Sequence, residues 1–257
     1  MSILEIVRPG TWLEGQQFEV GREIEFYFSN LESTFFGANA ALNLFEKELI
    51  REIPDISVEQ WEVNSARVMA EEKRILSDEG GLSLEKRGDL YYQACVNVKR
   101  RRWESGEVPE MILSHYIFIF GKSFVYSLDL FSLFLLRIKK EAWAPDNIDS
   151  ICTDFFDGIP SLRDVRNSFH HQEDRAFGIG GDRKQMNIQP INNGIFGGQH
   201  GALIGESLNG RFLGTTIGDG SFVEIEVSEG TLMLAQKAIH DLYSSFQWSG
   251  SKVHLPT

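Results

Sequence analysis

The sequence predicts a mainly α-helical protein, with an antiparallel helical bundle, a small antiparallel β-meander and a C-terminal helix. Three observations support this fold class. Apolar residues recur every three to four positions through residues 21–177, which is the period of amphipathic helices. From residue 178 glycine becomes frequent, and two turn signals stand between alternating segments. The last segment returns to the helical period. We therefore expect a bundle over 1–177 and a meander plus closing helix over 178–257, packed together as one unit.

Six helices are expected in the first part of the chain. Proline supports their boundaries, because it is accommodated in the first turn of a helix and disrupts the interior. The third helix ends on the basic run 99–102, whose charges complement the negative end of a helix dipole. The expected ranges are 23–52, 57–80, 84–104, 109–143, 147–156 and 160–176.

The segment 109–143 is the most apolar of these. His115, Lys122, Asp129 and Arg137 interrupt it, and a membrane interior tolerates such groups poorly. We therefore expect a buried core helix of a soluble protein, with no membrane association. Lys122 and Asp129 are seven residues apart on one face, which predicts a pair of core charges or a polar seam facing the bundle.

The second part of the chain carries the β signals. Asn209-Gly210 and Asp219-Gly220 are dipeptides typical of hairpin turns. After the second turn, valine and isoleucine alternate with glutamate over 223–227, as in a strand with one buried face. The pattern predicts a three-stranded antiparallel meander over 202–227. Ser228 is a suitable N-cap for a last helix over 231–246.

Composition restricts the classes of function. The chain has 257 residues, 42% of them hydrophobic, and a formal net charge of −12. This charge opposes a broad electrostatic grip on duplex nucleic acid but allows a small cleft for a few nucleotides. Cys95 and Cys152 lack the spacing of a thiolate metal site and do not suggest a disulfide scaffold, so a reducing cytoplasm is expected. The first residues do not resemble a signal peptide.

The segment 160–175 carries an unusual density of polar side chains. Arg166 and His170 are four residues apart, as are Asn167 and His171, so each pair can meet along a helix. Arg166 and His171 are five apart and diverge on an ideal helix. They converge on one cleft only if the helix bends or if a second subunit completes the site.

These residue types suffice to cleave RNA without a metal. A neutral imidazole takes the proton from a ribose 2′-hydroxyl, and an imidazolium protonates the leaving 5′-oxygen. A guanidinium neutralises the charge that builds on the phosphate in the transition state. Neither a metal nor another cofactor is therefore expected. His170 and Asp174 are spaced as metal ligands, but too few further ligands accompany them.

The run Arg166-Asn167-x-x-x-His171 resembles the RNxxxH form of the Rx4-6H motif of the HEPN superfamily. The resemblance implies a HEPN-like bundle and a metal-independent endoribonuclease, of the kind found in toxin–antitoxin and defence systems. It implies a homodimer with a composite cleft, an RNA substrate, and an antitoxin or other regulatory partner. Carried over by position, Arg166 and His171 become catalytic and Asn167 supports them.

Two alternatives remain open from the residues. Arg163 and His170 also satisfy the loose motif, and we otherwise expect them to bind substrate. The polar face can also serve recognition alone, which would make the chain a non-catalytic dimerisation, RNA-binding or nucleotide-binding module. The net acidity and the added meander favour this second interpretation, whereas the combination of arginine, asparagine and histidine favours the nuclease.

Overall fold

A computed structural model describes residues 2–51, 58–78, 87–181, 183–191 and 201–257. Its contacts divide the chain into two compact units, Met1–Ile50 with Tyr116–Thr257, and Arg51–His115. The sequence did not predict a separate unit at Arg51–His115, and the expected boundary at residue 177 stays a prediction. The second unit is an insertion in the sequence of the first.

The described residues are mainly helical, as the sequence predicts. The helices are α1 (Phe18–Leu49), α2 (Val58–Asp78), α3 (Arg87–Glu104), α4 (Glu110–Ile138), α5 (Ile148–Gly158), α6 (Leu162–His170), α7 (Gln172–Ala176) and α8 (Glu229–Ser244). The expected ends at 52 and 80 and the expected starts at 57 and 84 lie outside the described residues. Ser228 caps α8 as predicted, because its hydroxyl accepts a hydrogen bond from the Thr231 N–H at 3.2 Å.

Three helix predictions need correction. The expected helix 160–176 is interrupted at His171, giving α6 and α7. The first helix begins at Phe18 rather than at residue 23. The apolar helix ends at Ile138, five residues before its expected end. After it the chain forms turns that bring Trp143 back onto α1, where the indole donates a hydrogen bond to Glu23 at 3.1 Å. The two residues are far apart in the sequence, so the helical period could not predict this contact.

The antiparallel meander is confirmed. It consists of β3 (Ser207–Asn209), β4 (Phe212–Thr216) and β5 (Phe222–Glu226), in the order β3-β4-β5. Both turns contain a glycine in the left-handed region, at a φ of 58° for Gly210 and 91° for Gly220. A side chain there would be strained, which explains the Asn-Gly and Asp-Gly signals.

Four short strands pair the two ends of the chain and are absent from the sequence prediction. β1 (Ile6–Arg8) pairs with β7 (Val253–Leu255), and β2 (Trp12–Leu13) with β6 (Trp248–Ser249), both antiparallel. Strands of two or three residues are too short to show a period, and their partners lie at the opposite end of the sequence.

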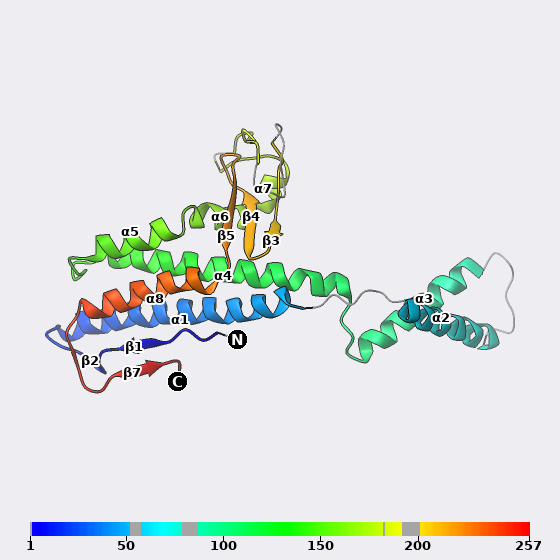
Figure 1. The fold of residues 1–257 in the computed structure, drawn as a ribbon, viewed down its shortest axis with the longest axis horizontal. Helices are drawn as coiled ribbons and strands as arrows, with labels where there is room; N and C mark the ends of the chain where they lie inside the picture. The colour runs from blue at the N-terminus through cyan, green and yellow to red at the C-terminus, as the bar shows by residue number, and fades with distance from the viewer. Residues whose placement is uncertain (1, 52–57, 79–86, 182, 192–200) are drawn as a thin grey trace. The chain divides into compact units, whose positions relative to one another are not determined.

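In the first unit α1 packs against α8, which also packs against α5, and α4 runs beside them (Figure 1). The meander contacts α6 on the far side of α4 from α1. Phenylalanines fill much of this core. The fully buried ones are Phe28, Phe35 and Phe45 of α1, Phe124 and Phe131 of α4, and Phe155 of α5.

A buried carboxylate connects the N-terminal strand to two of these helices. Glu32 on α1 accepts two hydrogen bonds of 2.6 Å from the Arg8 guanidinium, in a bidentate pair. The hydroxyl of Tyr243 on α8 donates a third hydrogen bond to the same carboxylate. Burial and the neighbouring Glu32 charge raise the pKa of Tyr243, so the hydroxyl keeps its proton and its role as donor.

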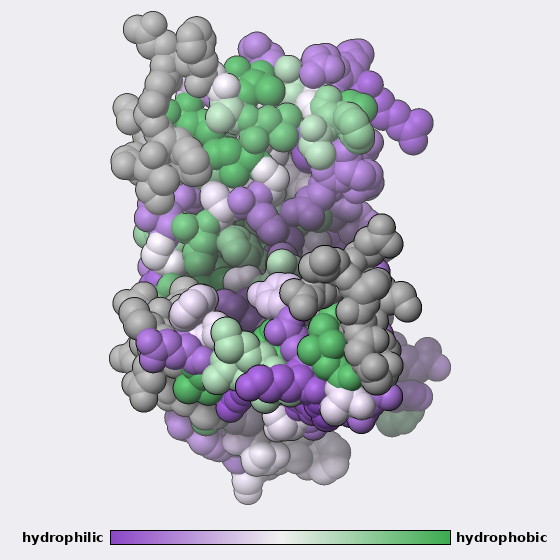
Figure 2. Space-filling view, turned by 90° about the vertical axis from the view of Figure 1, so that its right-hand side faces the viewer, coloured by the Kyte–Doolittle hydropathy of each residue, from purple (hydrophilic) through white to green (hydrophobic). Residues whose placement is uncertain are grey.

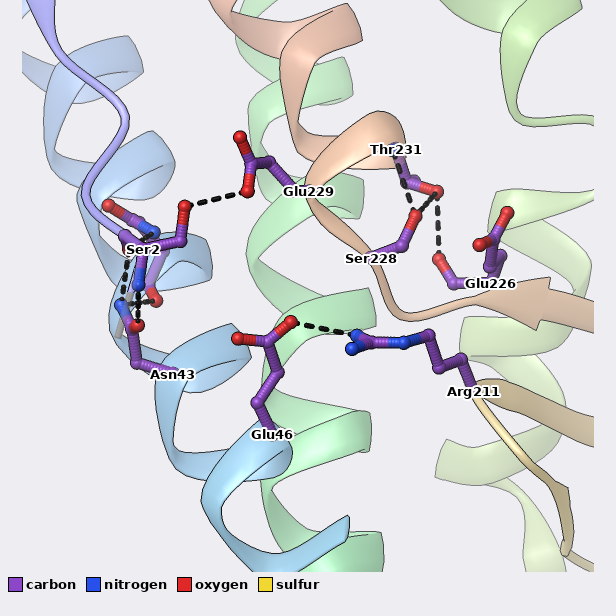
Figure 3. A network of polar contacts seen from close by, with 9 residues as sticks. Ser2, Asn43, Glu46, Arg211, Glu226, Ser228, Glu229 and Thr231 are labelled. Carbon is purple, nitrogen blue, oxygen red and sulfur yellow. Dashed lines mark hydrogen bonds and ion pairs between the residues drawn. The ribbon is translucent and has the colours of Figure 1, made fainter. Parts of the chain in front are cut away.

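A second polar network joins the N-terminal segment and the meander to the same helices (Figure 3). The Ser2 hydroxyl donates to Glu229 at the start of α8, at 2.7 Å. Arg211, in the turn between β3 and β4, pairs with Glu46 of α1 at 2.8 Å. The meander is therefore attached to the bundle by a charged contact as well as by the apolar core.

α4 is the one described helix that is long and apolar enough to cross a membrane, by length and composition. In its most apolar window 44% of the residues are buried inside the protein, and Asp129 on this helix is buried with charged partners. Buried charge pairs of this kind are contacts of a core helix. On the face drawn in Figure 2, hydrophobic and hydrophilic side chains lie in alternating patches.

In the second unit α2 and α3 pack against each other around Glu71. This carboxylate is 3% exposed and accepts hydrogen bonds from Arg74 on its own helix and from Asn97 and Arg101 on α3. Arg74, and then Arg101, hold the pKa of Glu71 at about 2, well below its usual 4.5. A charged hydrogen-bond cluster is thus part of the contact between α2 and α3.

We expect Glu71 to make this unit sensitive to acid. A depressed folded-state pKa adds stability above pH 4.5, and that stability is lost as the pH falls towards 2. The difference in free energy of unfolding between wild type and Glu71→Gln should therefore be largest near neutral pH and shrink between pH 4.5 and 2. Hydrogen exchange of α2 and α3, followed by mass spectrometry and corrected for intrinsic rates, measures it. A difference that is constant with pH would contradict the expectation.

Candidate functional site

The motif helix α6 is short and strongly two-sided. Leu162, Val165 and Phe169 are buried on the side that packs inward, against β4 and β5 of the meander. Ser161 before the helix adopts a left-handed conformation, with φ 61°. The polar residues of the motif lie on the other sides of α6, where Arg163 and Arg166 reach Asp129 of α4.

The helix is interrupted at His171, one of the expected catalytic residues. Its φ of −112° and ψ of 43° lie outside the helical region. Its N–H still donates to the Asn167 carbonyl at 3.0 Å, and its carbonyl accepts from the Arg175 N–H at 3.1 Å. The chain therefore turns at His171 while the hydrogen-bond ladder continues through it, which gives the imidazole a direction that a straight helix would not.

Asp129 of α4 organises the arginines of the motif. Its carboxylate is 3% exposed and accepts a hydrogen bond of 2.6 Å from Nε of Arg163. Nε of Arg166 lies 3.4 Å from its other oxygen. Two cations thus share one buried anion, which leaves the cluster with an excess positive charge at the surface. Asp129 lies on the predicted polar face of α4, but its partners are on α6 and not at Lys122.

The Arg166 guanidinium is held from three sides. Besides Asp129, Nη1 donates to the side-chain oxygen of Asn167 at 3.2 Å, and the group lies 5.7 Å above the ring of Tyr126. Burial raises the pKa of Tyr126, and the Arg166 charge offsets part of that shift. Nη2 has no hydrogen-bond partner among the described residues. Arg166 is therefore positioned by its neighbours and keeps N–H donors for an anion, with its side chain 34% exposed.

The two histidines form a pair of their own. Their ring centroids are 5.0 Å apart at an interplanar angle of 83°, and both residues are exposed. Nδ1 of His171 lies 3.8 Å from Glu173. Within the described part of the chain, neither imidazole shares a hydrogen bond or ion pair with Arg166. The structure thus brings Arg163, Arg166 and Asn167 together around Asp129, and places His170 and His171 beside them as a separate pair.

Further polar residues surround the motif that the sequence did not assign to it. Lys122 of α4 forms an ion pair with Glu206, which also accepts a hydrogen bond of 3.3 Å from Gln172. The Lys122 ammonium lies 5.5 Å over the Phe169 ring. Glu206 comes from the segment before the meander, so no spacing within the helices could have identified it. The position of Lys122 on the same face of α4 as Asp129 was the available signal.

A candidate cation cluster overlaps the motif. His171, Glu173 and Asp174 each offer a ligand atom, and these atoms lie within 4.8 Å of one another. One imidazole and two carboxylates are donors that zinc accepts, with a fourth position left to water. Such a metal would engage the imidazole that metal-free proton transfer requires. Metal binding and metal-free proton transfer are therefore alternative roles for His171. A chelator distinguishes them, because it would abolish only a metal-dependent activity.

Comparisons with protein-family models, with curated proteins and with solved structures find no significant match to this chain. The interpretation of the site accordingly rests on its residues and geometry and on the motif.

We expect Asp129→Asn to lower the free energy of unfolding by about 2 kcal/mol, because a buried carboxylate with two charged partners is lost. Urea denaturation followed by circular dichroism measures the change. Asp164→Asn is the matched control, since Asp164 is an exposed carboxylate on α6, and it should change stability by less than about 0.5 kcal/mol. Equal effects of the two substitutions would show that Asp129 does not organise the site.

Proposed function

We propose that this chain is a metal-independent endoribonuclease of the HEPN type, acting in the cytoplasm as a toxin or defence effector. The observation that carries the proposal is the fixed Arg166 guanidinium, with free donors, beside two exposed imidazoles at the break between α6 and α7. The proposed substrate is RNA, and an antitoxin or other regulatory protein would restrain the activity.

In the proposed mechanism His171 transfers the proton and Arg166 stabilises charge on the phosphate. Attack of the 2′-oxygen on phosphorus expels the 5′-oxygen, leaving a 2′,3′-cyclic phosphate and a 5′-hydroxyl. Asn167 and Asp129 act as positioning residues, because both hold the guanidinium rather than reach the phosphate. His170 and Arg163 would bind the substrate strand on either side of this pair.

A twofold dimer would complete the site. On α4, Ile119 and Leu130 are eleven residues apart and share one face, where they are 51% and 45% exposed. α1 packs on one side of this face, through Phe134 against Tyr27, and α6 on the other, through Asp129. Two copies joined across this face would bring their Arg166 residues together, because Arg166 contacts Tyr126 between Ile119 and Leu130. A twofold contact of this kind places each motif opposite its copy.

We expect purified protein to cleave RNA in excess chelator. His171→Ala should lower the cleavage rate by about 10²–10⁴-fold, the usual contribution of a positioned proton-transfer group. Arg166→Lys should also be poor, since an ammonium cannot reproduce the planar fork. His254→Ala is the matched control, because His254 is another exposed histidine beside a glutamate, 3.1 Å from Glu5. Product ends are identified by mass spectrometry.

The outcomes of this experiment discriminate between the open alternatives. Loss of activity in His170→Ala but not in His171→Ala would assign the site to Arg163 and His170. Loss on chelation would favour a metal held by His171, Glu173 and Asp174. If neither histidine matters, the proposed mechanism is wrong.

We expect the dimer to depend on the exposed face of α4. Leu130→Glu should weaken dimerisation by about 100-fold or more, because a charge would be buried at a central apolar contact. Met233→Glu, on an exposed site of α8, should not change it. Sedimentation velocity at micromolar concentration measures both. A wild-type monomer under these conditions would contradict the proposed composite site.

One observation favours a second candidate, a non-catalytic RNA-binding or dimerisation module. Arg166 already has an anionic partner, and it makes no contact with either imidazole in the described residues. Such a module would bind RNA without cleaving it, and its expression alone would not slow growth, in contrast to an active nuclease.

A further inference from the structure

The second unit contains a basic groove in an otherwise acidic chain. The groove has a volume of about 490 Å³ and lies between α2 and α3. Four arginines line it against a single carboxylate, that of Glu71. Its lining residues are Arg67, Ala70, Glu71, Arg74, Val98, Arg101, Arg102 and Ser105.

The hydrogen bonds to Glu71 hold two of these arginines in place but do not use all of their N–H donors. Arg101 uses Nη2 for its 2.6 Å contact with Glu71, and its side chain is 53% exposed. Arg74 makes two contacts to Glu71 and one to Asp78, and its side chain is 57% exposed. A guanidinium has five N–H donors, so Arg101 in particular keeps several for a ligand.

The other two arginines differ in how far they are engaged. Arg102 is paired with Glu107 and also contacts Asn64. Arg67 is exposed and forms no hydrogen bond or ion pair with any described residue, although its charge, after that of Arg102, contributes to the lowered pKa of Glu107. The groove therefore offers two guanidiniums, those of Arg67 and Arg101, whose donors are largely free to bind an anion.

Tyr91 adds an aromatic surface to this side of α3. It is 58% exposed, and it precedes Val98 and Arg102 of the groove by seven and eleven residues, which places it on their face of the helix. Arginines that contact phosphates, together with an exposed ring on which a base can stack, are features of surfaces that bind single-stranded nucleic acid.

We propose that the groove between α2 and α3 binds the phosphate backbone of single-stranded RNA, with Arg67 and Arg101 as the principal contacts. The choice of RNA rests on the proposed function, whereas the anionic character of the ligand rests on the groove itself. The second unit would then capture a strand by its backbone, independently of sequence.

Binding is measured with the full chain carrying both His170→Ala and His171→Ala, which removes both candidate proton-transfer groups, and a fluorescent twelve-nucleotide oligouridylate. We expect Arg67→Gln with Arg101→Gln to weaken binding by about tenfold or more. It should also reduce the slope of log affinity against log salt by about 1.4, since each phosphate contact on a single strand contributes about 0.7. The matched control is Lys99→Gln with Arg100→Gln, which removes the same charge from α3 outside the groove.

Arg67→Gln alone keeps the Glu71 cluster intact and should reduce the slope by about 0.7, which separates a binding defect from an unfolded hairpin. Equal losses in the groove variant and in the control would overturn the proposal, because binding would then be diffuse. If the groove binds RNA but the wild-type protein, which retains His171, does not cleave it, the proposed nuclease is refuted and the proposed groove is supported. If the wild-type protein cleaves RNA but the groove substitutions do not weaken binding, the nuclease is supported and the groove proposal is refuted.

Discussion

The candidate site depends on one buried carboxylate. Asp129 projects from the core helix α4 and accepts the charges of Arg163 and Arg166, so α6 can approach α4 with its polar face inward at that point. A buried anion without partners is costly, and it restricts the arrangements of α6 to those that supply guanidiniums. The same contact sets the direction in which Arg166 presents its remaining donors.

The two units are organised around the same kind of interaction. Glu32, Asp129 and Glu71 are each buried and each bind one or two arginines, and in every case the carboxylate and an arginine belong to different elements. In the first unit these clusters are added to a large aromatic core. In the second, the described buried apolar residues are few, namely Leu90, Ala94 and Val98 of α3, and the two arginines on Glu71 are more than half exposed.

A division of labour between the two units follows from the proposals. Strand capture would fall to the second unit, and the proposed reacting groups would be those of the first unit, on α6 and at its junction with α7. A net charge of −12 would not oppose such binding, because the four arginines of the groove and the two arginines on Asp129 are local concentrations of positive charge.

By itself the sequence determined the helical class, the meander and its glycine turns, the cap at Ser228, and the polar face that carries Arg166, Asn167, His170 and His171. These features depend on residues a few positions apart, which is the range over which periodicity acts. Only the tertiary structure decided the pairing of the chain ends, the partners of Asp129 and Lys122, the break at His171 and the Glu71 cluster. Periodicity shows which face a residue occupies, but the charge that it meets there comes from another element, and its approach is set by packing of the whole unit.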